Sequence, residues 1–230
     1  MLDYRNEKKY LCSETALTVL EARLKPLMKP DPHQAPGACY HIRSMYFDDY
    51  ENSCMMENEA GVDARTKFRI RIYPPDVTVI RLELKSKLHG LTRKESCSLN
   101  QEQLDRVLRG DTARFLTDRD TPSKLRRLVL AMQTRLLAPK VIVDYDRTAY
   151  LLQEGNVRVT FDRNIRACTA FDRFLDDWIP GIPVLDTGQQ LLEVKYDEFL
   201  PGYLTGMFQY GSFRETAFSK YMLCRERSPL

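Results

Sequence analysis

The feature that most constrains the fold is an alternation of charged and apolar residues between positions 65 and 73. The odd positions hold Arg65, Lys67, Arg69, Arg71 and Tyr73, whereas apolar side chains fill positions 68, 70 and 72. Successive side chains of a β-strand point to opposite faces of its sheet. The segment is therefore predicted to be a strand with one cationic face and one apolar face.

Other segments repeat this polarity, which changes its interpretation. Charged or polar residues on one face of a predicted strand occur at positions 5, 7 and 9, at 81, 83, 85 and 87, at 158, 160 and 162, and at 193 and 195. A single such strand could belong to an open sheet whose charged face is solvated. Because a sheet of many strands tends to curl and closure removes its exposed edges, we expect a closed barrel with a charged lumen.

The remaining sequence predicts helices around this sheet. One helix follows the N-cap Ser13, one follows a capping box of Asn100 and Gln103 and ends at Gly110, and one lies within residues 122–137. Strands are predicted at residues 4–11, 39–47, 64–73, 77–87, 91–99, 140–150, 157–163 and 191–196. Residues 169–189 are predicted to be a long loop that could cover a site opening.

The expected fold class is thus α+β: a closed antiparallel β-barrel with helices packed on its outside. The chain of 230 residues contains no segment with the composition of a linker, so a single domain is expected over residues 1–230. The net charge of only +3 argues against a globally basic nucleic-acid-binding protein. No window approaches the roughly 18 apolar residues of a membrane span, and the six cysteines are scattered. We therefore expect a cytoplasmic protein with reduced cysteines and no membrane partner.

Basic side chains confined in a lumen predict an anionic ligand. Their desolvation and mutual repulsion are unfavourable unless an anion is bound. Phosphate suits both the forked donors of Arg and the point charge of Lys, and carboxylates among them could hold a divalent metal. The alternative for acids such as Glu7 and Glu83 is a purely structural salt bridge.

Taken together, motifs spread over most of the chain resemble one known family. They are Glu7-x-Lys9-Tyr10, Tyr46-Phe47-Asp48, Lys67-x-Arg69-x-Arg71-x-Tyr73, Glu83-x-Lys85-x-Lys87, Tyr145-x-Arg147-x-x-Tyr150, Arg158-x-Thr160-x-Asp162, Glu193-x-Lys195-Tyr196 and Ser219-Lys220-Tyr221. This set resembles the VTC (vacuolar transporter chaperone) polyphosphate polymerase domain, which belongs with the CYTH-like triphosphate tunnel enzymes.

The resemblance implies an ATP-dependent polyphosphate polymerase assisted by Mn²⁺ or Mg²⁺, with ATP and inorganic polyphosphate as its partners. By match to the motifs, phosphates would be held by Lys9, Lys67, Arg69, Arg71, Lys85, Lys87, Arg147, Arg158 and Lys220. Tyr145 and Lys195 would complete the catalytic set, and Glu193 would be the metal ligand. Of Arg93 and Lys94, either could face the tunnel.

Transfer to a phosphate acceptor needs no side-chain nucleophile, which agrees with the lack of His in the strand motifs. Two alternatives remain open. One is a hydrolase of the same superfamily, acting on inorganic triphosphate, thiamine triphosphate or RNA 5′-triphosphate. Against it, Arg5 occupies the place of an early Glu found in many such hydrolases, and fewer acids would hold fewer metals to activate water. The other is a non-catalytic module that binds polyphosphate or nucleic acid.

Overall fold

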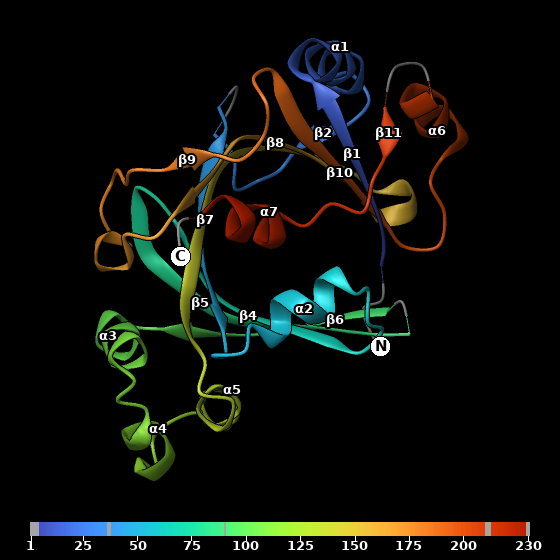
Figure 1. The fold of residues 1–230 in the computed structure, drawn as a ribbon. Coiled ribbons are helices and arrows are strands. Elements are labelled where there is room, and N and C mark those ends of the chain that lie inside the picture. Colours follow the sequence, from blue (N-terminus) through green and yellow to red (C-terminus); the bar gives the residue numbers. More distant parts are fainter. Residues whose placement is uncertain (1–4, 36–37, 90, 210–212, 229–230) are drawn as a thin grey trace.

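The computed structural model describes residues 5–35, 38–89, 91–209 and 213–228. One antiparallel sheet curls around a concave face and dominates the molecule (Figure 1). Its strands are β1 (Asn6–Ser13), β2 (Lys29–Pro30), β3 (Tyr40–Asp48), β4 (Arg65–Tyr73), β5 (Asp76–Leu88), β6 (Leu91–Leu99), β7 (Ala138–Leu152), β8 (Val157–Cys168), β9 (Ile182–Pro183), β10 (Gln189–Tyr196) and β11 (Arg214–Glu215). Each strand predicted from alternation is present, although Tyr4, where the first was expected to begin, lies outside the described residues.

The prediction of a closed barrel is wrong. The strand order is β11-β1-β10-β8-β7-β3-β4-β5-β6, with β2 beside β7 and β9 beside β8. In the described part of the chain, β6 pairs with neither β1 nor β11, so the two ends of the path do not meet. The sheet is a curled, open one.

The reason lies at the edge of β1 that a closing strand would use. The segment before the C-terminal helix covers this edge: β11 pairs with the middle of β1, and the amide of Thr216 donates to the carbonyl of Lys9 at 2.9 Å. A covered edge no longer needs a closing strand. Side chains bridge the seam instead, since Nζ of Lys85 on β5 lies 3.6 Å from Oε2 of Glu7 on β1.

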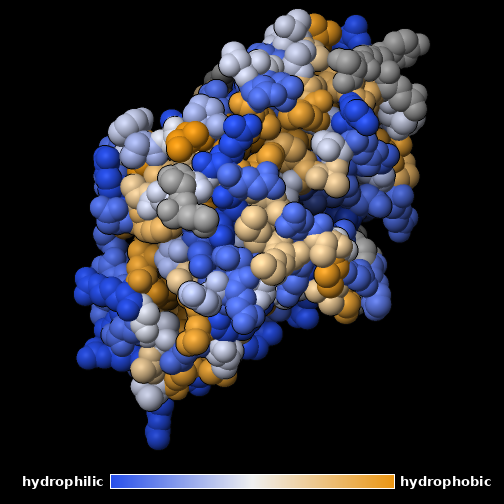
Figure 2. Space-filling model, in the orientation of Figure 1, coloured by the Kyte–Doolittle hydropathy of each residue, from blue (hydrophilic) through white to orange (hydrophobic). Residues whose placement is uncertain are grey.

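The convex face is apolar and is covered by helices. Over β1, β8 and β10 lie α1 (Glu14–Leu24) and α6 (Gly202–Gln209); over β3 to β6 lie α3 (Gln101–Arg109), α4 (Ala113–Thr117) and α5 (Ser123–Thr134). The helices α1, α3 and α5 were predicted, and the caps are confirmed: Ser13 accepts from the amide of Ala16, and Asn100 and Gln103 form the capping box. On the face shown in Figure 2, apolar residues form short streaks between hydrophilic ones.

Two short helices that the sequence did not predict line the concave side. They are α2 (Ser53–Glu59) and α7 (Lys220–Arg227), and α7 lies inside the curl of the sheet (Figure 1). Residues Tyr221 and Met222 of α7 pack with Val141 and Val143 of β7. The expectation that helices pack only on the outside is therefore also wrong. Helices of seven or eight residues are too short to show a helical period in the sequence.

The predicted long loop packs against both faces of the sheet, since Val184 belongs to the same apolar cluster as Tyr221 and Met222 of α7. It contains η2 (Phe171–Arg173) and β9, and its residues Phe174 and Ile179 are buried in the convex core with α3 and α5. The guanidinium of Arg43 donates to the carbonyl of Phe174 at 2.9 Å. A further 3₁₀ turn, η1 (Glu154–Asn156), joins β7 to β8. Within the described ranges, no helix is long and apolar enough to cross a membrane.

Candidate functional site

Strand register brings the predicted charged residues together on the concave face, which we call the lumen. Lys9 of β1 lies beside Glu193 of β10, and Arg69 of β4 beside Glu83 of β5. Paired residues of neighbouring strands share a face. The register also decides between the two bases of β6: Lys94 pairs with Lys85 and lies 3.5 Å from Glu83, so it faces the lumen. Arg93 is displaced by one residue and faces away from the lumen.

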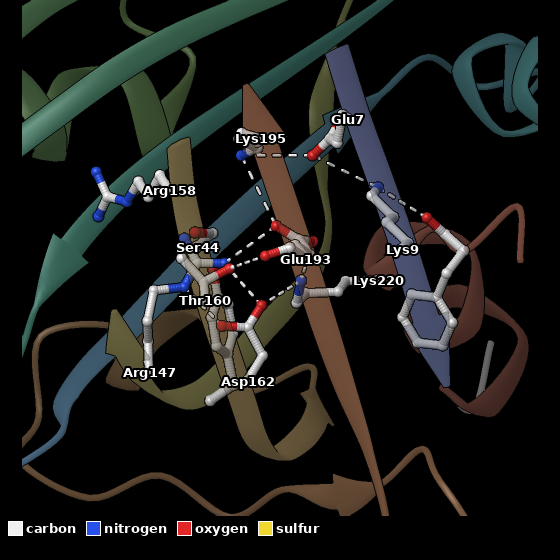
Figure 3. Close-up of polar contacts among 12 residues, drawn as sticks. Glu7, Lys9, Ser44, Arg147, Arg158, Thr160, Asp162, Glu193, Lys195 and Lys220 are labelled. Carbon is white, nitrogen blue, oxygen red and sulfur yellow. Dashed lines mark hydrogen bonds and ion pairs between the residues drawn. The ribbon is translucent and has the colours of Figure 1, made fainter. Parts of the chain in front are cut away.

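The most deeply buried part of the lumen is a cluster of two acids and two bases (Figure 3). Arg147 of β7 donates twice to Asp162 of β8, each time at 2.6 Å, and lies 3.4 Å from Glu193. Nζ of Lys220, the first residue of α7, lies 2.6 Å from both Asp162 and Glu193. Asp162 is fully buried. We call these four residues the central cluster.

The acids and bases of the central cluster keep one another ionised. Burial alone would raise the pKa of Glu193, but Lys220, Lys195, Lys9 and Arg147 lower it well below its ordinary value. Burial alone would lower the pKa of Lys220, but the carboxylates of Asp162 and Glu193 raise it above its ordinary value. All four groups therefore stay ionised around neutral pH. The sequence predicted cations that repel one another in an empty lumen, whereas the structure shows them paired with acids.

A second group surrounds Glu7 on β1. Its carboxylate lies 3.4 Å from Nζ of Lys195, 3.6 Å from that of Lys85 and 3.9 Å from that of Lys9. Burial would raise the pKa of Glu7, but these three ammonium groups lower it to about 2. Lys195 also lies 3.7 Å from Glu193, so it stands between the two acids. Burial lowers the pKa of Lys195 to about 8 despite these partners.

Strands β3, β4 and β5 supply a third group. The guanidinium of Arg69 contacts Glu83 at 2.6 Å and donates to the hydroxyl of Tyr46 at 3.0 Å. That of Arg71 donates to Ser44 at 3.0 Å. Thus Tyr46 and Ser44, which sequence reasoning did not assign to the site, orient the two predicted arginines. The pairing register of β3 with β4 could have identified them, because it sets the even positions of β3 opposite the odd positions of β4.

The ammonium of Lys67 on β4 has neutral hydrogen-bond partners. Its Nζ donates to Oδ1 of Asn58 at 2.5 Å and to Oγ of Ser219 at 3.2 Å, both of which are neutral. Burial lowers its pKa to about 7, with repulsion from Lys9 and Lys85 adding to the effect. The ammonium can therefore lose its proton near neutral pH when no anion is bound.

Three adjoining cavities follow the lumen. The central one has a volume of about 130 Å³ and is lined by the central cluster except Asp162, together with Tyr46, Tyr145 and Lys67, Arg69 and Arg71 of β4. One neighbour of about 440 Å³ is lined by Arg65 and Lys87, and the other, of about 420 Å³, by Tyr40, Lys94 and Arg158. Glu7 and Lys85 line all three. An elongated, mostly cationic space results.

Not every predicted residue lies at the centre. Lys87 lines only the cavity of about 440 Å³. Arg158 points away from Glu193 in Figure 3 and contacts Asp31 at 2.6 Å and the hydroxyl of Tyr40 at 3.0 Å. His41 lies outside the lumen, between Asp144 and Asp146 at 2.6 and 2.8 Å.

A divalent metal fits this site only together with its substrate. Among the described residues, no group of three or more His, Cys, Asp or Glu side chains could hold a metal ion. Glu193 and Glu7 are close enough to contact the same ammonium of Lys195. Mg²⁺ is commonly held by one or two carboxylates plus substrate phosphates and water. The donor set suits such a shared ion and does not suit an all-protein cage.

The fold is thus a curled antiparallel sheet, and the candidate site is its cationic lumen. The VTC domain family model matches residues 4–228, so the chain belongs to that family. This membership supports a function related to polyphosphate or triphosphate.

Solved structures share the fold at low sequence identity. An adenylyl cyclase candidate from Hippeastrum, described with a dominant triphosphatase activity, is 15% identical with a TM-score of 0.57, and the match covers 99% of this chain and 97% of that one. The PH1819 protein from Pyrococcus horikoshii is 10% identical with a TM-score of 0.54, covering 98% and 100%. Comparison with curated protein sequences gives no match.

Proposed function

We propose that this chain is an ATP-dependent polyphosphate polymerase, which transfers the γ-phosphoryl group of ATP to the end of an inorganic polyphosphate chain. The observation that carries the proposal is the convergence of cations from β1, β4, β5, β7, β10 and α7 on one cavity that also exposes Glu193. This arrangement suits a linear chain of phosphates better than a single anion, because the three cavities extend the cationic lining beyond the centre.

In the proposed binding mode, the cations act at different points along the phosphates. Arg147, Lys220 and Arg69 would contact the transferring phosphoryl group, since they line the central cavity and are held by fixed acidic or phenolic partners. Lys87 and Arg158 would contact phosphates further out. Fixed donors of this kind stabilise developing negative charge without having to reorganise during the reaction.

The reaction itself is an in-line displacement. A terminal oxygen of the acceptor phosphate attacks the γ-phosphorus of ATP, the bond from that phosphorus to the bridging β–γ oxygen breaks, and ADP leaves with the electron pair. The acceptor oxygen is already largely ionised near neutral pH, so no general base is required. The hydroxyl of Tyr145 accepts from Arg71 at 3.5 Å and Tyr145 lines the central cavity, which supports a role for its own proton as a hydrogen-bond donor to the phosphates.

Glu193, with Glu7 beside it, would hold Mn²⁺ or Mg²⁺. A bound divalent ion would neutralise phosphate oxygens and orient the triphosphate. The other two acids of the lumen are each bonded to an arginine at 2.6 Å, Glu83 to Arg69 and Asp162 to Arg147. Few carboxylates are thus left to hold a second ion that would activate water, which supports phosphoryl transfer over hydrolysis.

Arg5 gives this preference a further basis. It lines the cavity of about 420 Å³ and contacts Asp197 at 2.8 Å, so the place of the early hydrolase acid carries a positive charge here. A hydrolase of the same superfamily remains the second candidate. The non-catalytic module is the third, although Glu193 in a pure anion site would repel its ligand. Nucleic acid fits less well, because the bases line a concave face and not an outer surface with exposed aromatic side chains.

Product analysis tests the proposal. The purified protein is incubated with ATP and Mn²⁺, with and without excess chelator, and the products are separated on a gel. We expect ADP and long phosphate chains in the presence of metal, and neither in chelator. A Lys220→Ala variant should form no chains. Orthophosphate as the sole product would instead establish the hydrolase, and polyphosphate binding without turnover would establish the binding module.

A further inference from the structure

Asp48 and Tyr221 have no part in the phosphate contacts described above, yet the structure joins them. The hydroxyl of Tyr221 on α7 donates to Oδ2 of Asp48 at 2.6 Å. Both side chains are buried, with exposed fractions of 0% for Asp48 and 2% for Tyr221. Burial and the Asp48 carboxylate both raise the pKa of Tyr221, so its hydroxyl remains a donor.

Asp48 also anchors the other helix of the concave side. Its carboxylate accepts from the amides of Cys54 at 2.9 Å and Met55 at 3.0 Å, at the start of α2. The opposite end of α2 carries Asn58, which accepts from Lys67 in the lumen. One buried carboxylate thus fixes both short helices that carry lumen residues.

Tyr221 directly follows Lys220, the base that joins Asp162 and Glu193. The ring of Tyr221 packs 5.1 Å from that of Tyr46, and its hydroxyl accepts from Arg225 at 3.2 Å, one turn further along α7. Ring and hydroxyl together fix both the depth and the rotation of the first turn of this helix. A rotation there would displace Nζ of Lys220 from its two 2.6 Å contacts.

We propose that Asp48 and Tyr221 are positioning residues, which hold the first turn of α7 so that Lys220 is aligned for phosphate. This inference rests on the proposed function, because it assigns Lys220 a role in binding the phosphates. The ring of Tyr221 lines the central cavity, but its hydroxyl is committed to Asp48. Its effect on the ligand should therefore pass through Lys220.

The experiment is a double-mutant cycle, in which inorganic tripolyphosphate binding is measured by calorimetry for Tyr221→Phe, Lys220→Ala and both together. Tyr221→Phe keeps the ring and removes only the hydroxyl. We expect it to weaken binding about fivefold or more, and to have no further effect once Lys220 is gone, because coupled residues are non-additive. Equal weakening in both backgrounds, or none in either, would overturn the inference.

A matched control is available on the convex side. The hydroxyl of Tyr150 donates to Glu21 at 2.7 Å, so Tyr150→Phe removes a similar tyrosine–carboxylate bond far from the lumen. It should leave tripolyphosphate affinity unchanged, and an equal loss would overturn the positioning role. If Tyr221→Phe does not fold, Asp48→Asn replaces it, with the same expected coupling to Lys220. If Lys220→Ala binds as tightly as the parent, the proposed function itself fails, which is a distinguishable result.

Discussion

Nζ of Lys220 and a carboxylate oxygen of Glu193 lie 2.6 Å apart, although one belongs to a helix inside the curl and the other to a central strand of the sheet. The same ammonium contacts Asp162 at the same distance. A base and an acid that both line the proposed transfer site are therefore already bonded to each other in the free protein. When substrate binds, Lys220 would contact phosphate and Glu193 would contact the metal. A substitution of Glu193 tests this exchange of partners most sharply.

Glu193→Gln should separate binding from catalysis. The amide keeps the size of the side chain and removes its charge. Lys220 retains Asp162 and Lys195 retains Glu7, so we expect the fold to persist. Turnover should fall about 100-fold, because the metal ligand is lost. Polyphosphate binding in chelator should be kept or become tighter, as measured by calorimetry.

The contrary outcome for this variant is specific. If Glu193 serves only as a structural partner of Lys220 and Lys195, Glu193→Gln should lower the melting temperature and leave metal-dependent turnover per folded molecule near that of the parent. Glu7, Glu83 and Asp162 would then remain as candidate metal ligands.

Lys67 should make phosphate binding depend on pH. Its pKa is lowered to about 7 in the free protein, and a bound anion would raise it again. Below pH 7 the ammonium is already charged and contributes fully. As the pH rises above 7, binding must first return a proton to it, so affinity falls by up to about tenfold per pH unit. Lys195, with a pKa of about 8, should add a second loss at higher pH.

The comparison variant is Lys67→Arg, whose charge does not titrate in this range. Tripolyphosphate affinity measured from pH 6 to 9 should fall less steeply above pH 7 in this variant than in the parent. The ionisation of the ligand itself cancels in this difference. Identical pH profiles for the two proteins would contradict the assignment.

Arg69→Ala and Arg163→Ala should both destabilise the fold, but only the first should weaken the ligand. Arg69 bonds Glu83 inside the lumen, whereas Arg163 bonds Glu14 and Glu21 on the convex side. Removing one partner of a mostly buried pair costs about 3 kcal/mol of unfolding free energy for Arg69. We expect Arg69→Ala to lose about 2 kcal/mol of tripolyphosphate binding free energy as well. Equal affinities in the two variants would point to a purely structural Arg69.

Sequence reasoning found the strands and their polarity because alternation is a local property. The cationic face of β4 follows directly from positions 65 to 73, and Ser13 and Asn100 mark helix starts through the residues beside them. Placing Arg147 beside Asp162, in contrast, requires the register of two strands with a bulge between residues 144 and 146. That register depends on long-range pairing, which the sequence does not display.

The closed barrel was predicted on the general ground that exposed edges are unfavourable. The chain avoids the edge of β1 differently, by laying the segment around Thr216 along it. The positions of Asn58 and Ser219 beside Lys67 could not be predicted for a related reason: both lie on or next to short helices that fold only against the concave face. Tertiary packing, and not local periodicity, forms these helices.

The most direct test of phosphoryl transfer to phosphate is the fate of oxygen from water. The protein is incubated with ATP, Mn²⁺ and a short polyphosphate primer in ¹⁸O-enriched water, and the products are examined by mass spectrometry. If the terminal phosphate of the primer is the nucleophile, ADP formation should be matched by added phosphate units in the polymer, with no ¹⁸O in the transferred phosphoryl group. Orthophosphate carrying one ¹⁸O atom per ADP formed would show that water attacks, and would contradict the polymerase.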